Sequence, residues 1–280
     1  MSDSKYNTIQ SNLLKGTRIY LSGPMDFVAS REDEKKYGWR NRISSWLQAR
    51  GAIVFDPWNK PEVRGLEGYG NEDEQSTSPR EIWSFEDNEE GAGRRARCAE
   101  HFWPIMHMDL RMVDIADFVI AFCPTNIYSV GTPHEIVVAR QQHKPVLFVS
   151  PPVEYSALGK LENALADRPE ELKLLQELKL KVPIKENPRG IPSLWYMPLL
   201  NSEHFFDGFG FGLEEYQQEL NWDEPNERDT NEKNKSYARP LLPFLARMVA
   251  GEAPPKWDRK KNEYRPDDNW LLLDLGNTGT

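Results

Sequence analysis

Short apolar runs alternate with stretches of helical spacing along the first half of the chain. Each run is rich in Val, Ile, Leu or Phe and stops at or near a glycine or proline, as buried strands do where they enter loops. We expect four such strands, at 18–22, 52–57, 117–124 and 145–151. Between the first two, apolar and aromatic side chains recur every three or four residues from Ser30 to Arg50, which predicts one helix that stops at Gly51.

Two more helices complete this pattern. One lies between the third and fourth predicted strands, at 133–143. The other precedes the third strand, and Pro104 indicates a break or a first turn there. Its apolar positions have helical spacing, and they are Ile105, Met108, Met112 and Ile115.

Strands that alternate with helices, each strand a continuous apolar run, indicate a parallel sheet covered by helices on both faces. The sequence therefore predicts an α/β fold with a Rossmann-like or flavodoxin-like sheet. Ligands of such sheets bind beyond the carboxyl ends of the strands, where loops lead into helices. Three loops meet this description, SGPMDF with Gly23, Pro24 and Met25, DPWNK, and CPTNIYSVGTPHE, and we expect them to lie side by side.

Two regions lack a clear pattern. The segment from Trp58 to Cys98 is rich in acidic residues and glycine and has no sustained period, which is typical of a functional or disordered loop. Beyond Pro152 the chain alternates charged helical, aromatic glycine-rich and linker-like stretches. We expect a catalytic domain at 17–152 and a mostly helical and irregular C-terminal extension at 153–280, which caps the site or forms an interface.

The charge of the chain restricts its partners. Among 280 residues, 44 are acidic and 35 basic, which gives a formal net charge of −9. This balance argues against binding to a nucleic acid polymer or an anionic membrane and favours small-molecule ligands. Cys98 and Cys123 are the only cysteines, and no stretch resembles a signal peptide or a membrane span, so we expect a cytoplasmic protein without disulfides.

Glu135 is the sharpest candidate for chemistry. It follows Gly131, Thr132 and Pro133 in what the pattern predicts to be the first turn of a helix, near backbone N–H groups and the positive helix end. The alternative is an ordinary acidic residue at a helix N-terminus. Its place beyond a buried strand favours a functional role.

Asp109 and Tyr20 are further candidates, each with a structural alternative. Asp109 lies on the helix before the third strand, where it faces the strand ends or is a solvated helix acid. Tyr20 lies in the first strand, where its hydroxyl reaches a carboxylate or its ring packs in the core. Ser129 and the amides around Gly131 offer hydrogen bonds to a hydroxyl or a phosphate. The five histidines have no metal-ligand spacing, and no P-loop or dinucleotide fingerprint is present, so we expect neither metal nor organic cofactor.

Taken together, IYLSGPM, HMDLRMVDIADFVIAF and SVGTPHEIVVARQQHKPVLFV resemble the nucleoside 2-deoxyribosyltransferase superfamily, which includes the 2′-deoxynucleoside 5′-phosphate N-hydrolases. The resemblance covers roughly residues 17 to 152. It implies that Glu135 is the nucleophile that attacks C1′ of the sugar, as in a retaining glycosidase. It also implies that Asp109 positions or protonates the leaving base and that Tyr20 orients the nucleophile.

The resemblance further implies a preference for a type of substrate and an oligomeric state. The transferases usually carry an acid where this chain has Ser129, whereas the N-hydrolases carry a serine there that contacts the 5′-phosphate. A hydroxyl with loop amides accepts a phosphate, so the sequence favours a 5′-phosphorylated substrate. Family sites are often completed by a neighbouring subunit, which implies a homo-oligomer.

The sequence leaves the function class open at several points. It predicts cleavage of the N-glycosidic bond of a nucleoside or nucleotide, by hydrolysis or by transfer to another base. One alternative is a module that binds and senses a nucleotide without turnover. A second is an interaction protein that works through its aromatic C-terminal half.

Overall fold

A parallel sheet forms the centre of the molecule. The computed structural model describes residues 12–71, 81–181, 186–200, 204–211, 226–227, 237–252, 255–258 and 260–266. The sheet has five strands in the order β2-β1-β3-β4-β5, and every pair of neighbours is parallel. The strands are β1 (Arg18–Ser22), β2 (Ile53–Phe55), β3 (Phe118–Phe122), β4 (Val146–Val149) and β5 (Phe205–Phe206). The predicted α/β fold with a Rossmann-like parallel sheet is confirmed.

Helices connect these strands and continue after the last of them. They are α1 (Arg31–Tyr37), α2 (Trp39–Gln48), α5 (Glu89–Ile115), α6 (Gly131–Gln141), α7 (Ser156–Ala164), α8 (Pro169–Lys181), α9 (Tyr196–Leu200) and α10 (Leu241–Val249). Two short antiparallel pairs lie outside the sheet, β6 (Asn226–Glu227) with β7 (Tyr237–Ala238), and β8 (Pro255–Asp258) with β9 (Glu263–Pro266). Within the described ranges, no helix has both the length and the apolar character needed to cross a membrane.

The single helix predicted between the first two strands is wrong, because the chain forms two. Ser30 caps α1 by accepting a bond from the Asp33 N–H at 3.1 Å, and Gly38 ends it in an extended conformation. A side chain at Gly38 would place its Cβ 2.2 Å from the Glu34 carbonyl oxygen. The break at Gly38 therefore separates the polar α1 from the buried α2.

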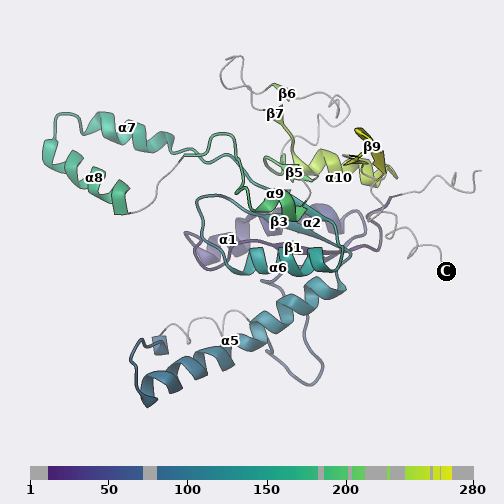
Figure 1. The fold of residues 1–280 in the computed structure, drawn as a ribbon, viewed down its shortest axis with the longest axis horizontal. Coiled ribbons are helices and arrows are strands. Elements are labelled where there is room, and N and C mark those ends of the chain that lie inside the picture. Colours follow the sequence, from purple (N-terminus) through teal and green to yellow (C-terminus); the bar gives the residue numbers. More distant parts are fainter. Residues whose placement is uncertain are drawn as a thin grey trace, which may run out of the picture.

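The prediction of a loop up to Cys98 is also wrong at its C-terminal end. Helix α5 begins at Glu89, and the Asn88 side chain caps it by accepting a bond from the Gly91 N–H at 2.8 Å. Pro104 lies inside this helix and does not end it. The N-terminal part of α5 extends away from the sheet (Figure 1), so most of its side chains face solvent and show no apolar period.

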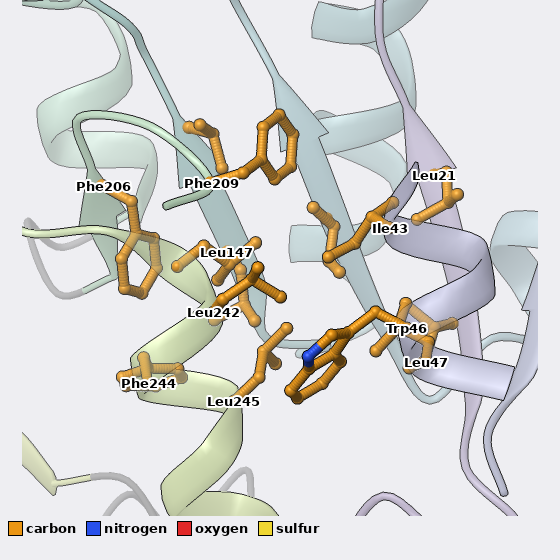
Figure 2. Packing of buried hydrophobic residues seen from close by; sticks show 14 of the residues in the cluster. Leu21, Ile43, Trp46, Leu47, Leu147, Phe206, Phe209, Leu242, Phe244 and Leu245 are labelled. Carbon is orange, nitrogen blue, oxygen red and sulfur yellow. The ribbon is translucent and has the colours of Figure 1, made fainter. Parts of the chain in front are cut away.

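The two faces of the sheet are covered by different helices. On one face, α2 and α10 pack against Ile19 and Leu21 of β1 and against alternate residues of β3 and β4 (Figure 2). On the other face, α5, α6 and α9 pack against Tyr20, Val119 and Phe148. Because side chains alternate along a strand, β1 supplies both cores.

The region beyond Pro152 contributes to the central sheet. Strand β5 pairs with β4, and α10 buries six of its nine residues, five of them in the core that it shares with α2. Helices α7 and α8 instead form a hairpin that lies apart from the sheet (Figure 1). Residues on both sides of the proposed boundary at 152 therefore belong to one core. The role of 153–280 as cap or interface stays a prediction.

Candidate functional site

The strand order defines where a ligand site is expected. The chain passes from β1 to β2 on one side and returns through α5 to β3 on the other side of β1. The carboxyl ends of β1 and β3 therefore form a topological switch point, at which parallel sheets bind their ligands. The loops that follow β2, β1 and β3 leave neighbouring strand ends, as the sequence predicts.

Glu135 lies at this point with both carboxylate oxygens engaged. The Tyr20 hydroxyl donates to Oε1 at 2.9 Å, and the Ser22 hydroxyl donates to Oε2. Glu135 is only 9% exposed, so it is not a solvated helix acid. The expected first-turn position is wrong, because α6 begins at Gly131 and Glu135 is its fifth residue. Strand hydroxyls, rather than the helix end, hold the carboxylate.

Burial and these hydrogen bonds act in opposite directions on Glu135. Loss of solvent raises the pKa of its carboxyl, whereas the bonds from Ser22 and Tyr20 and the charges of Arg40 and Lys60 lower it. Burial likewise raises the pKa of the Tyr20 hydroxyl well above its ordinary value, and the negative charges of Asp109 and Glu135 raise it further. Tyr20 is therefore a neutral donor to Glu135 at physiological pH.

Asp109 is a largely buried acid of α5. Its side chain is 13% exposed and forms an ion pair with Lys60, with Nζ and Oδ1 3.2 Å apart. Its negative charge raises the pKa of the Tyr20 hydroxyl. The solvated alternative for Asp109 is therefore wrong, and the charges of both predicted carboxylates act on the Tyr20 hydroxyl.

A buried arginine shapes the loop after β1. The Arg40 guanidinium of α2 donates to the carbonyl oxygens of Leu21, Gly23 and Pro24 at 3.3, 2.6 and 3.3 Å. At Gly23 a side chain would place its Cβ 2.8 Å from the Trp39 ring, so this position requires glycine. The predicted residues Gly23 and Pro24 thus belong to a loop held by Arg40, and Met25 follows them half-buried.

Two acids surround the same arginine. Glu34 and Asp56 approach the Arg40 guanidinium at 3.8 and 3.9 Å. Burial raises the pKa of Glu34, and the Arg40 charge lowers it. Asp56 also organises the turn after β2, where it accepts bonds from the Trp58 N–H at 3.0 Å and the Asn59 amide at 3.2 Å.

The loop after β3 brings Ser129, Gly131 and Thr132 to the start of α6. The Ser129 hydroxyl donates to the Thr132 hydroxyl at 2.9 Å and accepts from the Thr132 N–H at 3.4 Å. A Cβ built on Gly131 would lie 3.7 Å from Glu135 Oε1, so this backbone passes close to the carboxylate. The loop can therefore offer amides and a hydroxyl beside Glu135.

Cys123 and Tyr196 border the carboxylate on the side of α9, and the sequence did not single them out. Burial and the Glu135 charge raise the pKa of the Cys123 thiol, which hydrogen-bonds with the Tyr196 hydroxyl. Burial also raises the pKa of Tyr196 to about 12. The Tyr196 ring packs on Phe148 with centroids 4.6 Å apart. Because their pKa values are raised, the Cys123 thiol and the Tyr196 hydroxyl are both neutral, and they serve as packing partners.

Besides Cys123 and Tyr196, the sequence analysis missed Ser22, Arg40 and Lys60 at the candidate site. Ser22 shares a strand face with Tyr20 because the two are separated by two positions, and this period was the one available signal. Nothing in the helical pattern of α2 distinguishes Arg40 from a surface cation. In the described part of the chain, no cluster of three or more His, Cys, Asp or Glu side chains is arranged to hold a metal ion.

Comparisons with known proteins reveal similarity at the level of structure. No family model and no curated protein sequence matches the chain. A solved 2-deoxyribosyltransferase from Bacillus psychrosaccharolyticus is 21% identical over 50% of this chain and 76% of that one, with a TM-score of 0.26. A conserved protein from Enterococcus faecalis V583 is 16% identical over 73% of this chain and 99% of that one, with a TM-score of 0.37. At sequence identities this low, the similarity to these two structures concerns the fold and does not extend to function.

Proposed function

We propose that this protein cleaves the N-glycosidic bond of a (deoxy)nucleoside or its 5′-monophosphate through a covalent glycosyl-enzyme on Glu135. The observation that carries the proposal is the buried Glu135 carboxylate, held by the hydroxyls of Tyr20 and Ser22 at the switch point of the sheet. A desolvated carboxylate with fixed geometry suits attack on an anomeric carbon. The sequence resemblance to nucleoside 2-deoxyribosyltransferases supports the same chemistry.

The reaction has two displacement steps at C1′. A Glu135 oxygen attacks C1′ while the C1′–N bond breaks, and the electron pair of that bond leaves with the base, which takes up a proton. Water or a second base then attacks C1′ and gives up a proton, which balances the proton taken up by the first base, while the C1′–O bond to Glu135 breaks and the carboxylate is regenerated. The first acceptor gives hydrolysis, and the second gives transfer.

The neighbouring groups have separate roles in this scheme. Tyr20 and Ser22 orient the carboxylate and disperse its charge until positive charge develops on the sugar in the oxocarbenium-like transition state. Asp109 faces the leaving base and positions it or assists its protonation. Ser129 with the amides around Gly131 and Thr132 would receive the 5′-substituent, and the loop of Gly23, Pro24 and Met25 would line the sugar side.

Base release tests this proposal directly. The purified protein is incubated with each deoxynucleoside and ribonucleoside and with their 5′-monophosphates, with and without a free base, and release or exchange is followed by chromatography. We expect release that is lost in Glu135→Ala and retained in Glu177→Ala, which removes an exposed acid on α8.

Two negative results would point to the other function classes. Nucleotide binding without release, seen as a thermal shift in both the wild type and Glu135→Gln, would replace the enzyme with a sensing module. Absence of both binding and release across the panel would contradict any nucleotide function and favour an interaction protein.

A further inference from the structure

Lys60 occupies an unusual position for a lysine. It ends the turn after β2, which is closed by the Asn59 N–H donating to the Asp56 carbonyl oxygen at 2.9 Å. Its side chain is only 6% exposed. Lysine is almost never buried to this extent unless its charge is paired, because desolvation of an ammonium group is costly.

The partner of Lys60 is the second carboxylate of the site. Lys60 Nζ lies 3.2 Å from Asp109 Oδ1, and Asp109 is itself 13% exposed. The pair joins the turn after β2 to α5, two elements that flank the end of β1. The charges of Asp109 and Glu135 both act on the buried Tyr20 hydroxyl, so without Lys60 two negative charges would surround one buried group, which is electrostatically unfavourable.

We propose that Lys60 is a positioning residue whose ammonium group holds Asp109 toward the site and balances the negative charge of the two carboxylates. The role in attack rests on the proposed function, whereas the charge balance itself does not. The Lys60 charge favours the ionised form of Glu135, which the proposed attack requires, and the ion pair keeps Asp109 in place beside it.

Other groups that face Glu135 have different partners. Tyr20 and Ser22 donate to it from β1, and Cys123 borders it after β3 as a neutral thiol. Arg40 of α2 is bonded to the carbonyls of the loop after β1 and lies between Glu34 and Asp56. Arg40 and Lys60 both lower the pKa of Glu135, and Lys60 is the cation paired with the second site acid.

The ionisation of Glu135 can be measured without substrate. Protein labelled with ¹³C at glutamate side-chain carboxyls is titrated by NMR, and the Glu135 resonance is assigned by its loss in Glu135→Gln. We expect Lys60→Met to raise the Glu135 titration midpoint by about one pH unit or more. Lys60→Arg should restore the wild-type midpoint, and Lys160→Met, which removes an exposed charge on α7, should leave it unchanged.

A double variant separates charge balance from a structural effect and avoids an unpaired buried charge. Lys60→Met combined with Asp109→Asn removes one charge of each sign, so we expect its Glu135 midpoint to return most of the way to that of the wild type. An unmoved midpoint in folded Lys60→Met, or a midpoint in the double variant as high as in Lys60→Met, would overturn the proposal.

Base release measured on the same variants distinguishes the two proposals. If the wild type releases base, the acidic limb of its pH–rate profile should move with the Glu135 midpoint in Lys60→Met. Absence of release together with the expected midpoints would reject the proposed function and keep the role of Lys60. Normal base release together with an unmoved Glu135 midpoint in Lys60→Met would keep the proposed function and reject the role of Lys60.

Discussion

Strand β1 contributes side chains to both faces of the central sheet, and the two faces have different roles. Toward α2 and α10, β1 presents Ile19 and Leu21 to a core of aliphatic and aromatic side chains (Figure 2). Toward α6, the same strand presents Tyr20 and Ser22 to a buried carboxylate. The alternation of side chains along one strand therefore separates packing from chemistry, and changes on the two faces should have separable effects.

The largest expected effect comes from the packing face. Leu245 of α10 is fully buried, and Leu245→Ala should lower the free energy of unfolding by about 2–5 kcal/mol, because the cavity adds to the lost apolar burial. Denaturant unfolding measures this change. Leu174→Ala on the exposed surface of α8 is the control and should change stability by less than about 0.5 kcal/mol.

This substitution also tests the separation of the faces. Any base release per folded molecule should be unchanged in Leu245→Ala, because the residue lies on the opposite side of the sheet from Glu135. A variant that remains folded but loses activity would show that the two faces are coupled.

On the other face, Tyr20→Phe keeps the ring and removes the bond to Glu135. Since a hydrogen bond to a charged group contributes about 1.5–3 kcal/mol, we expect base release to fall roughly tenfold to a hundredfold. The Tyr20 bond lowers the pKa of Glu135, so its loss should also move the acidic limb of the pH–rate profile upward. Tyr37→Phe on the surface of α1 provides the control, and equal rates in the two variants would contradict the orienting role of Tyr20.

Stability against pH tests the burial of Glu135 without any substrate. Its pKa is raised in the folded protein from the ordinary value of 4.5, so the folded state binds more protons than the unfolded state above that pH. Wild-type stability should therefore fall, relative to Glu135→Gln, as the pH rises from 4.5 through the folded pKa. Within this window the free energy of unfolding of Glu135→Gln minus that of the wild type should grow by at most about 1.4 kcal/mol per pH unit.

Denaturant unfolding at several pH values measures that difference. Glu177→Gln on α8 is the matched control for removal of one carboxylate. A difference between Glu135→Gln and the wild type that stays constant, or that shrinks with rising pH, would contradict a raised pKa at Glu135.

The smallest effect is expected at Ser129. If its hydroxyl receives a 5′-phosphate, Ser129→Ala should reduce the preference for the monophosphate over the nucleoside by about tenfold or less, since one hydrogen bond contributes about 0.5–1.5 kcal/mol. The ratio of kcat/KM for the two substrates measures this preference. An unchanged ratio would assign Ser129 only to the bonds that it makes with Thr132, and Ser156→Ala on α7 is the control.

Much of the fold could be predicted because local pattern and tertiary role agree. The four strands expected from apolar runs all form, and the helix that carries Glu135 lies between β3 and β4 as expected. Strand β5 was missed because two residues have no readable period. The start of α5 was missed because a helix that extends from the sheet needs no apolar face, although its Asn88 cap followed by two glutamates was a readable signal.

The candidate site was only partly predictable. Glu135, Asp109 and Tyr20 were singled out from motifs, and the structure brings the first and last into contact at 2.9 Å. Lys60 and Arg40 were not singled out, because a cation in a polar segment has the same local signature whether it is solvated or buried. Their roles follow from partners far away in sequence.

By itself, the sequence determined the four strands that alternate with helical segments, the parallel sheet and the alternation that puts Tyr20 and Ser22 on one side of β1. These features depend on the spacing of residues within short segments, and this spacing can be read from the sequence without knowledge of the tertiary structure. The tertiary structure alone decided that Glu135 is desolvated, that Lys60 pairs with Asp109, and that Arg40 holds the loop at Gly23. Those features arise where residues from different elements meet around the end of β1, since burial and electrostatic interaction depend on distance in space and not on distance along the chain.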